Sequence, residues 1–154
     1  RSENRARFLK LLMPLRAALT VEGSPEGVGW VFSPTLNVDI TDLPGMPGWN
    51  LGLLAGPLFG SQRQNAYYYS VAPQYATPAR PTYEAPSGYA GMHYTMGMSK
   101  RFPNFWLGAF LRYGNLSGAR FEDSPLVVQK DSLGAGVALS WIFGESSTRV
   151  MVDD

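Results

Sequence analysis

The chain has 154 residues, a formal net charge of +1 and no cysteine. This length suits one domain, the small net charge offers no basic surface for nucleic acid, and the lack of cysteine excludes disulfide, thiolate-metal and thiol-nucleophile chemistry. Only 16% of the residues are charged, whereas 13% are aromatic and 17 are glycine. Since soluble domains usually carry about 25% charged residues, the charge content is low for a soluble protein.

Six stretches alternate between apolar and polar or small residues, which is the period of a β-strand with one apolar face. The opening stretch covers about 8–21, and the next, about 28–41, contains "VGWVFSPTLNVDI", which alternates almost without error. The remaining strands are predicted at about 48–60, 88–101, 105–115 and 131–143. We expect no helix, and residues 144–154 form a C-terminal tail.

Three features indicate that the apolar faces of these strands meet lipid rather than a protein core. Most runs span ten to thirteen residues, whereas soluble strands have about five or six and roughly 9 to 11 tilted residues cross a bilayer. The apolar faces carry no Asp, Glu, Lys or Arg. Aromatic residues also cluster toward the ends of these faces, as rings at the level of lipid headgroups do: Trp49 and Phe59, Phe105 and Tyr113, Trp141 and Phe143.

The connections between the strands alternate in length. The short "DLPGMPG" (42–48) and "PN" (103–104) alternate with long connections at 61–87 and 117–130, and outer-membrane barrels have short periplasmic turns and longer external loops. The pattern predicts an all-β fold, an antiparallel up-and-down transmembrane β-barrel. Because such barrels have at least about eight strands, we expect the six strands to be the C-terminal part of a larger closed barrel. The missing strands would come from the same parent chain or from another chain.

Five ionisable residues on the polar faces form a candidate lumen network: Lys10, Arg16, Asp39, His93 and Arg112. Their side chains either pair and fill a narrow barrel or line a selective path for a solute. The bulk of Trp106 and Phe110 on the same faces favours the first reading. His93 is the single histidine and has no nearby partner for a metal site or a nucleophilic triad, so we predict no catalytic, metal-binding or cofactor-binding residue and no enzyme activity.

The two long loops carry further candidate residues. The first is rich in tyrosine and predicts an external surface that either holds a ligand or packs over the barrel mouth: Tyr67, Tyr68, Tyr69, Tyr75 and Tyr83. In the second loop, Glu122 and Asp123 are adjacent carboxylates. Turn chemistry accounts for them better than an acid–base dyad, and a weak calcium contact is the alternative.

Several segments together carry a family resemblance. They are "GWVFSPTLNVDI", "GWNLGLLAGPLF", "YYYSVAPQYATPARPTYEAPSGYAG", "LGAFLRYGNLSGARFEDSPLV" and "GAGVALSWIF". From about Leu9 to Phe143 the chain resembles the C-terminal part of the MipA/OmpV family, the MltA-interacting outer-membrane barrels of Gram-negative bacteria.

The resemblance implies a location in the outer membrane of a Gram-negative bacterium, surrounded by outer-membrane lipid, with no cofactor. It also implies a non-enzymatic scaffold linked to murein-remodelling enzymes, namely a murein hydrolase (a lytic transglycosylase) and a peptidoglycan synthase, through the periplasmic surface. The polar faces and the tyrosine-rich loop leave a small porin-like channel or a ligand-binding barrel as the alternative.

Overall fold

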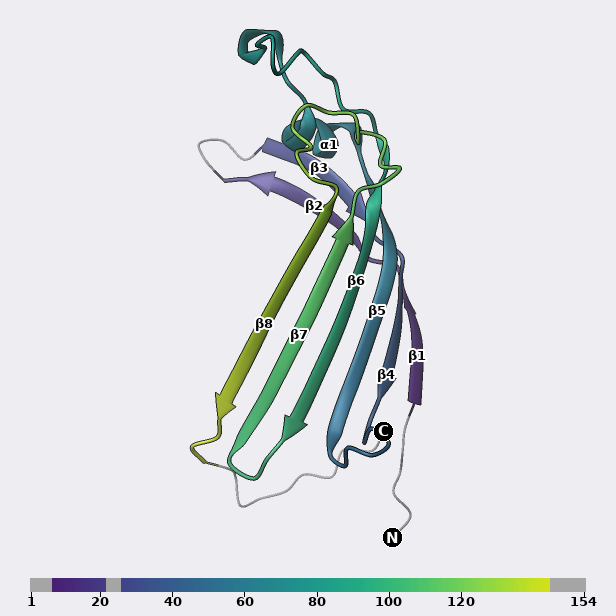
Figure 1. Cartoon of the computed structure of the whole chain (residues 1–154), viewed down its shortest axis with the longest axis vertical. Helices are drawn as coiled ribbons and strands as arrows, with labels where there is room; N and C mark the ends of the chain where they lie inside the picture. Colours follow the sequence, from purple (N-terminus) through teal and green to yellow (C-terminus); the bar gives the residue numbers. More distant parts are fainter. Residues whose placement is uncertain (1–6, 22–25, 145–154) are drawn as a thin grey trace.

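A computed structural model of the chain describes residues 7–21 and 26–144, and it contains one antiparallel sheet of eight strands (Figure 1). The strands are β1 (Arg7–Leu12), β2 (Leu15–Thr20), β3 (Glu26–Phe32), β4 (Thr35–Ile40), β5 (Trp49–Gly60), β6 (Gly88–Arg101), β7 (Phe105–Asn115) and β8 (Asp131–Trp141). Their order across the sheet is β1–β4–β5–β6–β7–β8, and β2 pairs with β3. The predicted all-β fold and antiparallel order are therefore confirmed. No helix in the described residues is long and apolar enough to cross a membrane.

Each of the first two expected strands is divided into two. Segment 8–21 forms β1 and β2, and segment 28–41 forms β3 and β4, with breaks at Pro14 and Pro34. Proline has no N–H to donate to a ladder, and at this corner the Ser33 N–H donates to the Pro14 carbonyl at 3.1 Å. Because β1 pairs with β4 and β2 with β3, the two halves belong to one bent hairpin. Its upper half bends away across the end of the sheet (Figure 1), and β3 pairs there with β5 at Val31 and Phe32.

The register sorts the alternating residues into rows that cross the sheet. One row defines the side that we call the polar face: Lys10, Asn37, Leu54, Thr95, Arg112 and Gly134. The neighbouring row points the other way and defines the apolar face: Leu9, Val38, Leu53, Met96, Leu111 and Ala135. The segregation predicted by the two-residue period thus persists across six strands.

Short and long connections lie at opposite ends of the sheet. The turns 41–48 and 102–104 lie at the lower end in Figure 1, and residues 61–87 and 116–130 lie together at the upper end, where we call them the cap. The cap contains α1 (Gln62–Tyr69) and a short 3-10 helix, η1 (Pro73–Tyr75).

The prediction of no helix is wrong for α1. Ser61 caps this helix by accepting a hydrogen bond from the Gln64 N–H at 3.3 Å, a standard N-cap contact. The sequence "QRQNAYYY" has no apolar stripe at helical spacing, so periodicity gave no sign of it.

The hydrophobic core of the described residues lies mainly in the cap. Ala85, Ala119 and Phe121 form its buried cluster, and Phe121 is 1% exposed. By contrast, apolar side chains on the sheet are uncovered, with Leu133 72% and Val137 76% exposed. Packing against protein therefore explains the cap but not the apolar face of the sheet.

The described part of the sheet does not close on itself. Among residues 7–21 and 26–144, β1 pairs only with β4 and β8 pairs only with β7. The up-and-down order is as expected, but the closed barrel stays a prediction.

Candidate functional site

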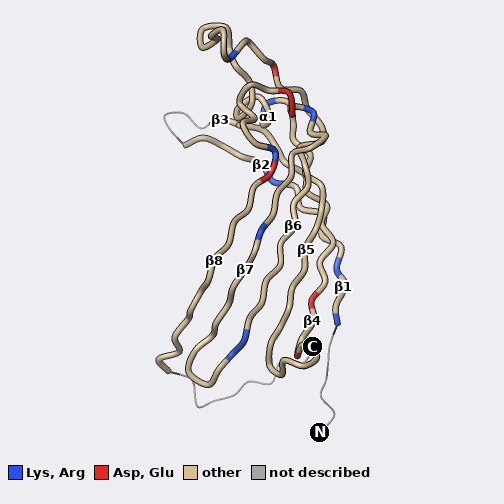
Figure 2. The backbone as a smooth tube through the Cα atoms, viewed as in Figure 1, with Lys and Arg blue, Asp and Glu red and all other residues tan. Residues whose placement is uncertain are grey.

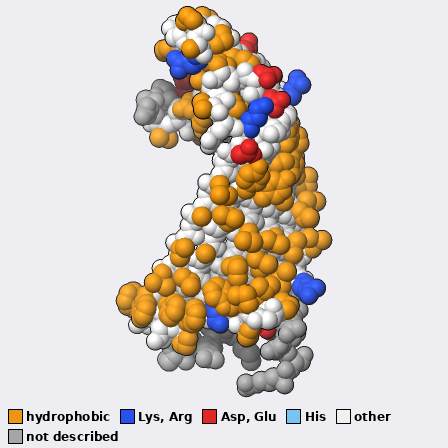
Figure 3. All heavy atoms as spheres, in the orientation of Figure 1, with side chains coloured by type: hydrophobic (Ala, Val, Ile, Leu, Met, Phe, Trp, Pro, Cys, Tyr) orange, Lys and Arg blue, Asp and Glu red, His pale blue; other side chains and the backbone are white. Residues whose placement is uncertain are grey.

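The apolar face presents a continuous hydrophobic surface over the strands. Figure 3 shows hydrophobic side chains along much of the sheet, with most charged side chains near the upper end and a few near the lower end. The row on this face that follows Leu11 contains Leu36, Ala55, Tyr94, Tyr113 and Leu133. Exposed apolar patches of this extent mark surfaces that meet lipid or protein.

Aromatic rings lie at both ends of the apolar face. At the lower end, the Phe105 ring stacks on Phe102 and on Trp141, with ring centroids 4.3 and 5.9 Å apart. At the upper end, Phe59 lies between Phe32 and Tyr89, at 6.4 and 6.0 Å. Rings at two levels are typical of the girdles that border the apolar band of a transmembrane barrel.

The spacing of the two aromatic levels matches a bilayer. Trp49 and Phe59 are ten positions apart on β5, which is about 33 Å along a strand at roughly 3.3 Å per residue. A strand tilt of about 40° reduces this to about 25 Å, the usual height of the apolar band.

Lys100 lies among the lower rings. Its ammonium donates to the Pro47 carbonyl at 3.0 Å and lies 5.8 Å from the Trp49 ring centre and 5.4 Å from that of Phe102. A cation held between rings and a turn carbonyl is a snorkelling geometry that suits a headgroup region.

The polar face separates the five predicted network residues into two groups, and Figure 2 shows how sparse charges are along the strands. In one group, the Lys10 ammonium lies 3.5 Å from Asp39, whose carboxylate also accepts from the Asn37 amide at 2.8 Å. This pair is open to solvent, with side chains 56% and 38% exposed, so it contributes about 0–1 kcal/mol.

The second group surrounds His93. Its Nε2 lies 3.5 Å from the Thr35 hydroxyl, and the guanidinium groups of Arg16 and Arg112 both act on the imidazole electrostatically. Arg112 and Lys10 share a row but are four strand spacings apart, about 19 Å along the sheet at roughly 4.8 Å per spacing. The five residues therefore form two separate groups rather than one network.

Two aromatic residues on the polar face cover glycines. A Cβ added at Gly108 would lie 2.1 Å from the Trp106 ring, and one at Gly136 would lie 2.5 Å from the Phe110 ring. Gly136 is also the cross-strand partner of Phe110, an arrangement known as aromatic rescue of glycine. The rings thus lie against the sheet, beside a hollow of about 560 Å³. The sequence signal for this contact is a glycine opposite an aromatic residue on the neighbouring strand. That signal can be recognised only when the register of β7 on β8 is known.

The five predicted loop tyrosines do not share one surface. Tyr67, Tyr68 and Tyr75 are 60%, 55% and 66% exposed. Tyr69 instead stacks on Phe121 with centroids 3.9 Å apart, and Tyr83 packs against the same core. Burial, with a smaller effect of Tyr68, raises the pKa of the Tyr69 phenol. The expected external surface is therefore reduced to three residues.

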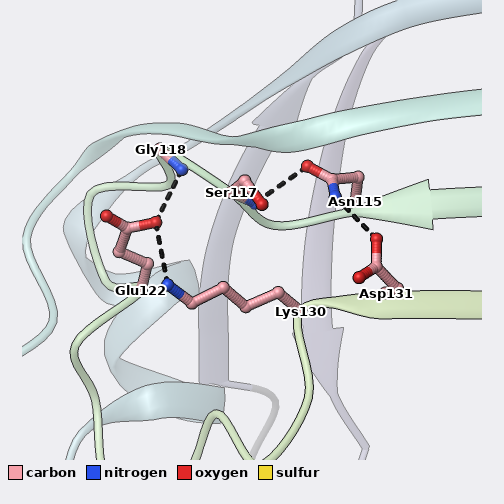
Figure 4. A network of polar contacts seen from close by, with 6 residues as sticks. All are labelled: Asn115, Ser117, Gly118, Glu122, Lys130 and Asp131. Atoms are coloured by element: carbon pink, nitrogen blue, oxygen red, sulfur yellow. Dashed lines mark hydrogen bonds and ion pairs between the residues drawn. The ribbon is translucent and has the colours of Figure 1, made fainter.

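Glu122 closes a turn within the cap (Figure 4). Its carboxylate accepts from the Gly118 N–H at 2.6 Å and lies 3.4 Å from the Lys130 ammonium. The Gly118 hydrogen bond first, and Lys130 second, lower the pKa of Glu122. Across the residues that the structure describes, no three His, Cys, Asp or Glu side chains group as metal ligands. These contacts support the role in a turn that was predicted for Glu122.

The fold and its surfaces define a class of protein: an antiparallel meander with one uncovered apolar face, ringed by aromatic residues and capped at one end. Residues 3–143 match the profile of the family described as MltA-interacting protein MipA. The chain belongs to this family, as the sequence resemblance predicted. Comparisons with curated proteins and with solved structures gave no match.

Proposed function

We propose that the chain is part of an outer-membrane β-barrel that acts as a non-enzymatic scaffold for murein-remodelling enzymes in a Gram-negative bacterium. The observation that carries the membrane part is the exposed apolar face, with aromatic rings at two levels about 25 Å apart when the strands tilt as barrel strands do. The family name, MltA-interacting protein, supports a murein enzyme as the partner.

The lower end of the sheet is the surface that we assign to the partner. If the long connections of the cap are external, the turns 41–48 and 102–104 face the periplasm. The first turn is well fixed, because the Asp42 carboxylate accepts from the Gly48 N–H at 2.6 Å and Lys100 donates to Pro47. Met46 at the turn is 40% exposed, which gives the lower end an apolar contact point.

Site-specific photo-crosslinking in cells tests this assignment. A photoreactive residue at position 46 should give an adduct with MltA, whereas the same residue at the exposed position 79 of the cap should not. An adduct from position 79 alone, or none from either position in protein recovered from the outer membrane, would contradict the scaffold with this orientation.

The polar face favours a second candidate, a small porin-like channel or ligand-binding barrel. Its charged and hydroxyl side chains and its 560 Å³ hollow would then border a solute path, with the cap over one mouth. Single-channel recording in a planar bilayer separates the two functions. A filled scaffold passes no current, whereas steady unitary conductance would favour the channel.

A further inference from the structure

A second hollow, of about 330 Å³, lies between the cap and the upper part of the polar face. Its floor comes from β5, β6, β7 and β8, and its roof comes from the cap. The side chains on which the argument depends are His93, Arg112 and Ser132 on the floor and Gln129 and Lys130 on the roof.

Positive charge is in excess around this hollow. Among the described residues, neither Arg112 nor the nearby Arg16 forms an ion pair with a carboxylate. Asp131 borders the hollow, but its carboxylate already accepts hydrogen bonds from the Tyr113 hydroxyl and, at 2.7 Å, from the Asn115 amide. Arg112 thus forms no ion pair among the described residues, and the side chains that line the hollow carry two positive charges, on Arg112 and Lys130, against the one negative charge of Asp131.

Two further observations point to unused hydrogen-bonding capacity. The Lys130 ammonium has a single carboxylate contact, Glu122 at 3.4 Å, and that carboxylate already accepts from the Gly118 N–H (Figure 4). The Nδ1 of His93 is buried without a hydrogen-bond partner among the described residues. Buried polar atoms are rarely left unsatisfied in this way, so one hydrogen-bonding position of a residue that lines the hollow is unused within the described chain.

We propose that this hollow binds a tetrahedral oxyanion, a phosphate or sulfate group, with Arg112 as the principal contact. A guanidinium presents two parallel N–H donors that match two oxygens of such a group. Gln129 and Lys130 on the roof supply donors from another direction, whereas the Ser132 hydroxyl on the floor donates to the Gly114 carbonyl at 3.5 Å and would have to turn to reach the anion. Donors on two opposing walls suit a tetrahedral anion better than a planar carboxylate. The site is independent of the scaffold role and of any contact at the lower end.

Calorimetric titration of the purified protein in detergent micelles, at constant ionic strength, tests the proposal. The probes are inorganic phosphate, glycerol 3-phosphate and acetate. Phosphate should bind, and acetate should bind much more weakly. Tighter binding of glycerol 3-phosphate would assign the site to a phosphate group on a larger molecule, and equal binding would assign it to the free anion. Both results support the site.

Matched variants locate the site within the molecule. Arg112→Gln should weaken phosphate binding about tenfold, as expected for loss of a charge-assisted hydrogen bond, and Arg112→Lys should recover part of it. Arg63→Gln is the control, because it changes the net charge equally on the exposed side of α1, outside the hollow. Its affinity should stay within about twofold of the unmodified protein.

Three results would overturn the proposal: no phosphate binding by the unmodified protein, equal loss in Arg63→Gln and Arg112→Gln, or acetate binding as tight as phosphate. Circular dichroism checks that each variant is folded. If Arg112→Gln does not fold, Lys130→Gln provides a second test of the phosphate site, because Lys130 lies in the cap and not in a strand. It should weaken phosphate binding about threefold, less than Arg112→Gln because Lys130 already contacts Glu122, and unchanged affinity would count against the roof of the site.

Discussion

Gly56 lies where the first hairpin bends over β5, and the chain leaves no room there for a side chain. A Cβ at this position would lie 2.2 Å from the Pro34 carbonyl oxygen and 2.9 Å from the Thr35 Cα. Because both are backbone atoms, Gly56→Ala must move the hairpin away from β5. We expect a loss of about 1–3 kcal/mol in the free energy of unfolding, measured by urea titration in lipid vesicles.

The matched control for Gly56→Ala is Gly134→Ala. A Cβ at Gly134, also on the polar face, meets nothing within 4 Å, so the free energy of unfolding should change by less than about 0.5 kcal/mol. Equal losses in the two variants would show that the lower free energy of unfolding comes from replacing a glycine in a strand, and not from the close contact of Gly56 with the backbone at Pro34.

The Glu122 carboxylate makes the stability of the cap depend on pH. Its folded pKa is lowered from the ordinary 4.5, so its contribution is fully present above that value and is lost as the pH falls through the folded pKa. Glu122→Gln should therefore be less stable than the unmodified protein at neutral pH, and the difference should shrink below about pH 4.5. Thermal unfolding of both proteins at several pH values measures this, and a difference that grows on acidification would contradict it.

At the scale of elements, α1 depends on one hydroxyl. The Ser61 Oγ accepts from the Gln64 N–H at 3.3 Å and from the Trp30 N–H, on β3, at 3.1 Å. Ser61→Ala removes both contacts, so we expect a loss of about 0.5–2 kcal/mol and faster amide exchange across α1. Ser117→Ala, on an exposed part of the cap, is the control and should leave exchange in α1 unchanged.

The elements that the sequence predicts well are those with a strict two-residue period. The period located β5 to β8 closely, because alternation in a half-buried strand is a local property. The same period gave no indication of the strand breaks at Pro14 and Pro34, because the alternation of apolar and polar residues continues across the bend. The helix α1 was missed because its sequence has no apolar stripe at helical spacing, and because the contact of Ser61 with β3 is made by a residue 31 positions away in the chain; the local N-cap serine was the one signal that could have indicated it.

Residues of the candidate site were predicted by face but not by partner. Parity placed Lys10 and Asp39 on one side of the sheet, yet only the register of β1 on β4 shows that they meet. Likewise, Arg112 and His93 come together because β6 pairs with β7. The hollow above them also needs Gln129 and Lys130, which a loop sequence without periodicity does not place.

For the whole molecule, the central expectation is that one face of the sheet meets lipid. Leu53 and Leu54 are adjacent on β5 but lie on the apolar and polar faces respectively. Leu53→Lys should lower the free energy of unfolding in lipid by about 2–4 kcal/mol, the cost of a lysine at mid-bilayer, and Leu54→Lys should cost much less. Similar losses, or the larger one at Leu54, would contradict a lipid-facing apolar side.

The two unpaired edges of the sheet raise the question of whether one polypeptide or two are needed to complete the fold. In the described part of the chain, β1 and β8 each have one edge without a neighbouring strand, and in lipid every unpaired backbone group costs several kcal/mol. Strands that complete the sheet from a second polypeptide would make folding bimolecular, so that the unfolding midpoint falls as the protein is diluted in lipid. Strands from the same polypeptide would make that midpoint independent of dilution, and a simple series of protein-to-lipid ratios distinguishes the two.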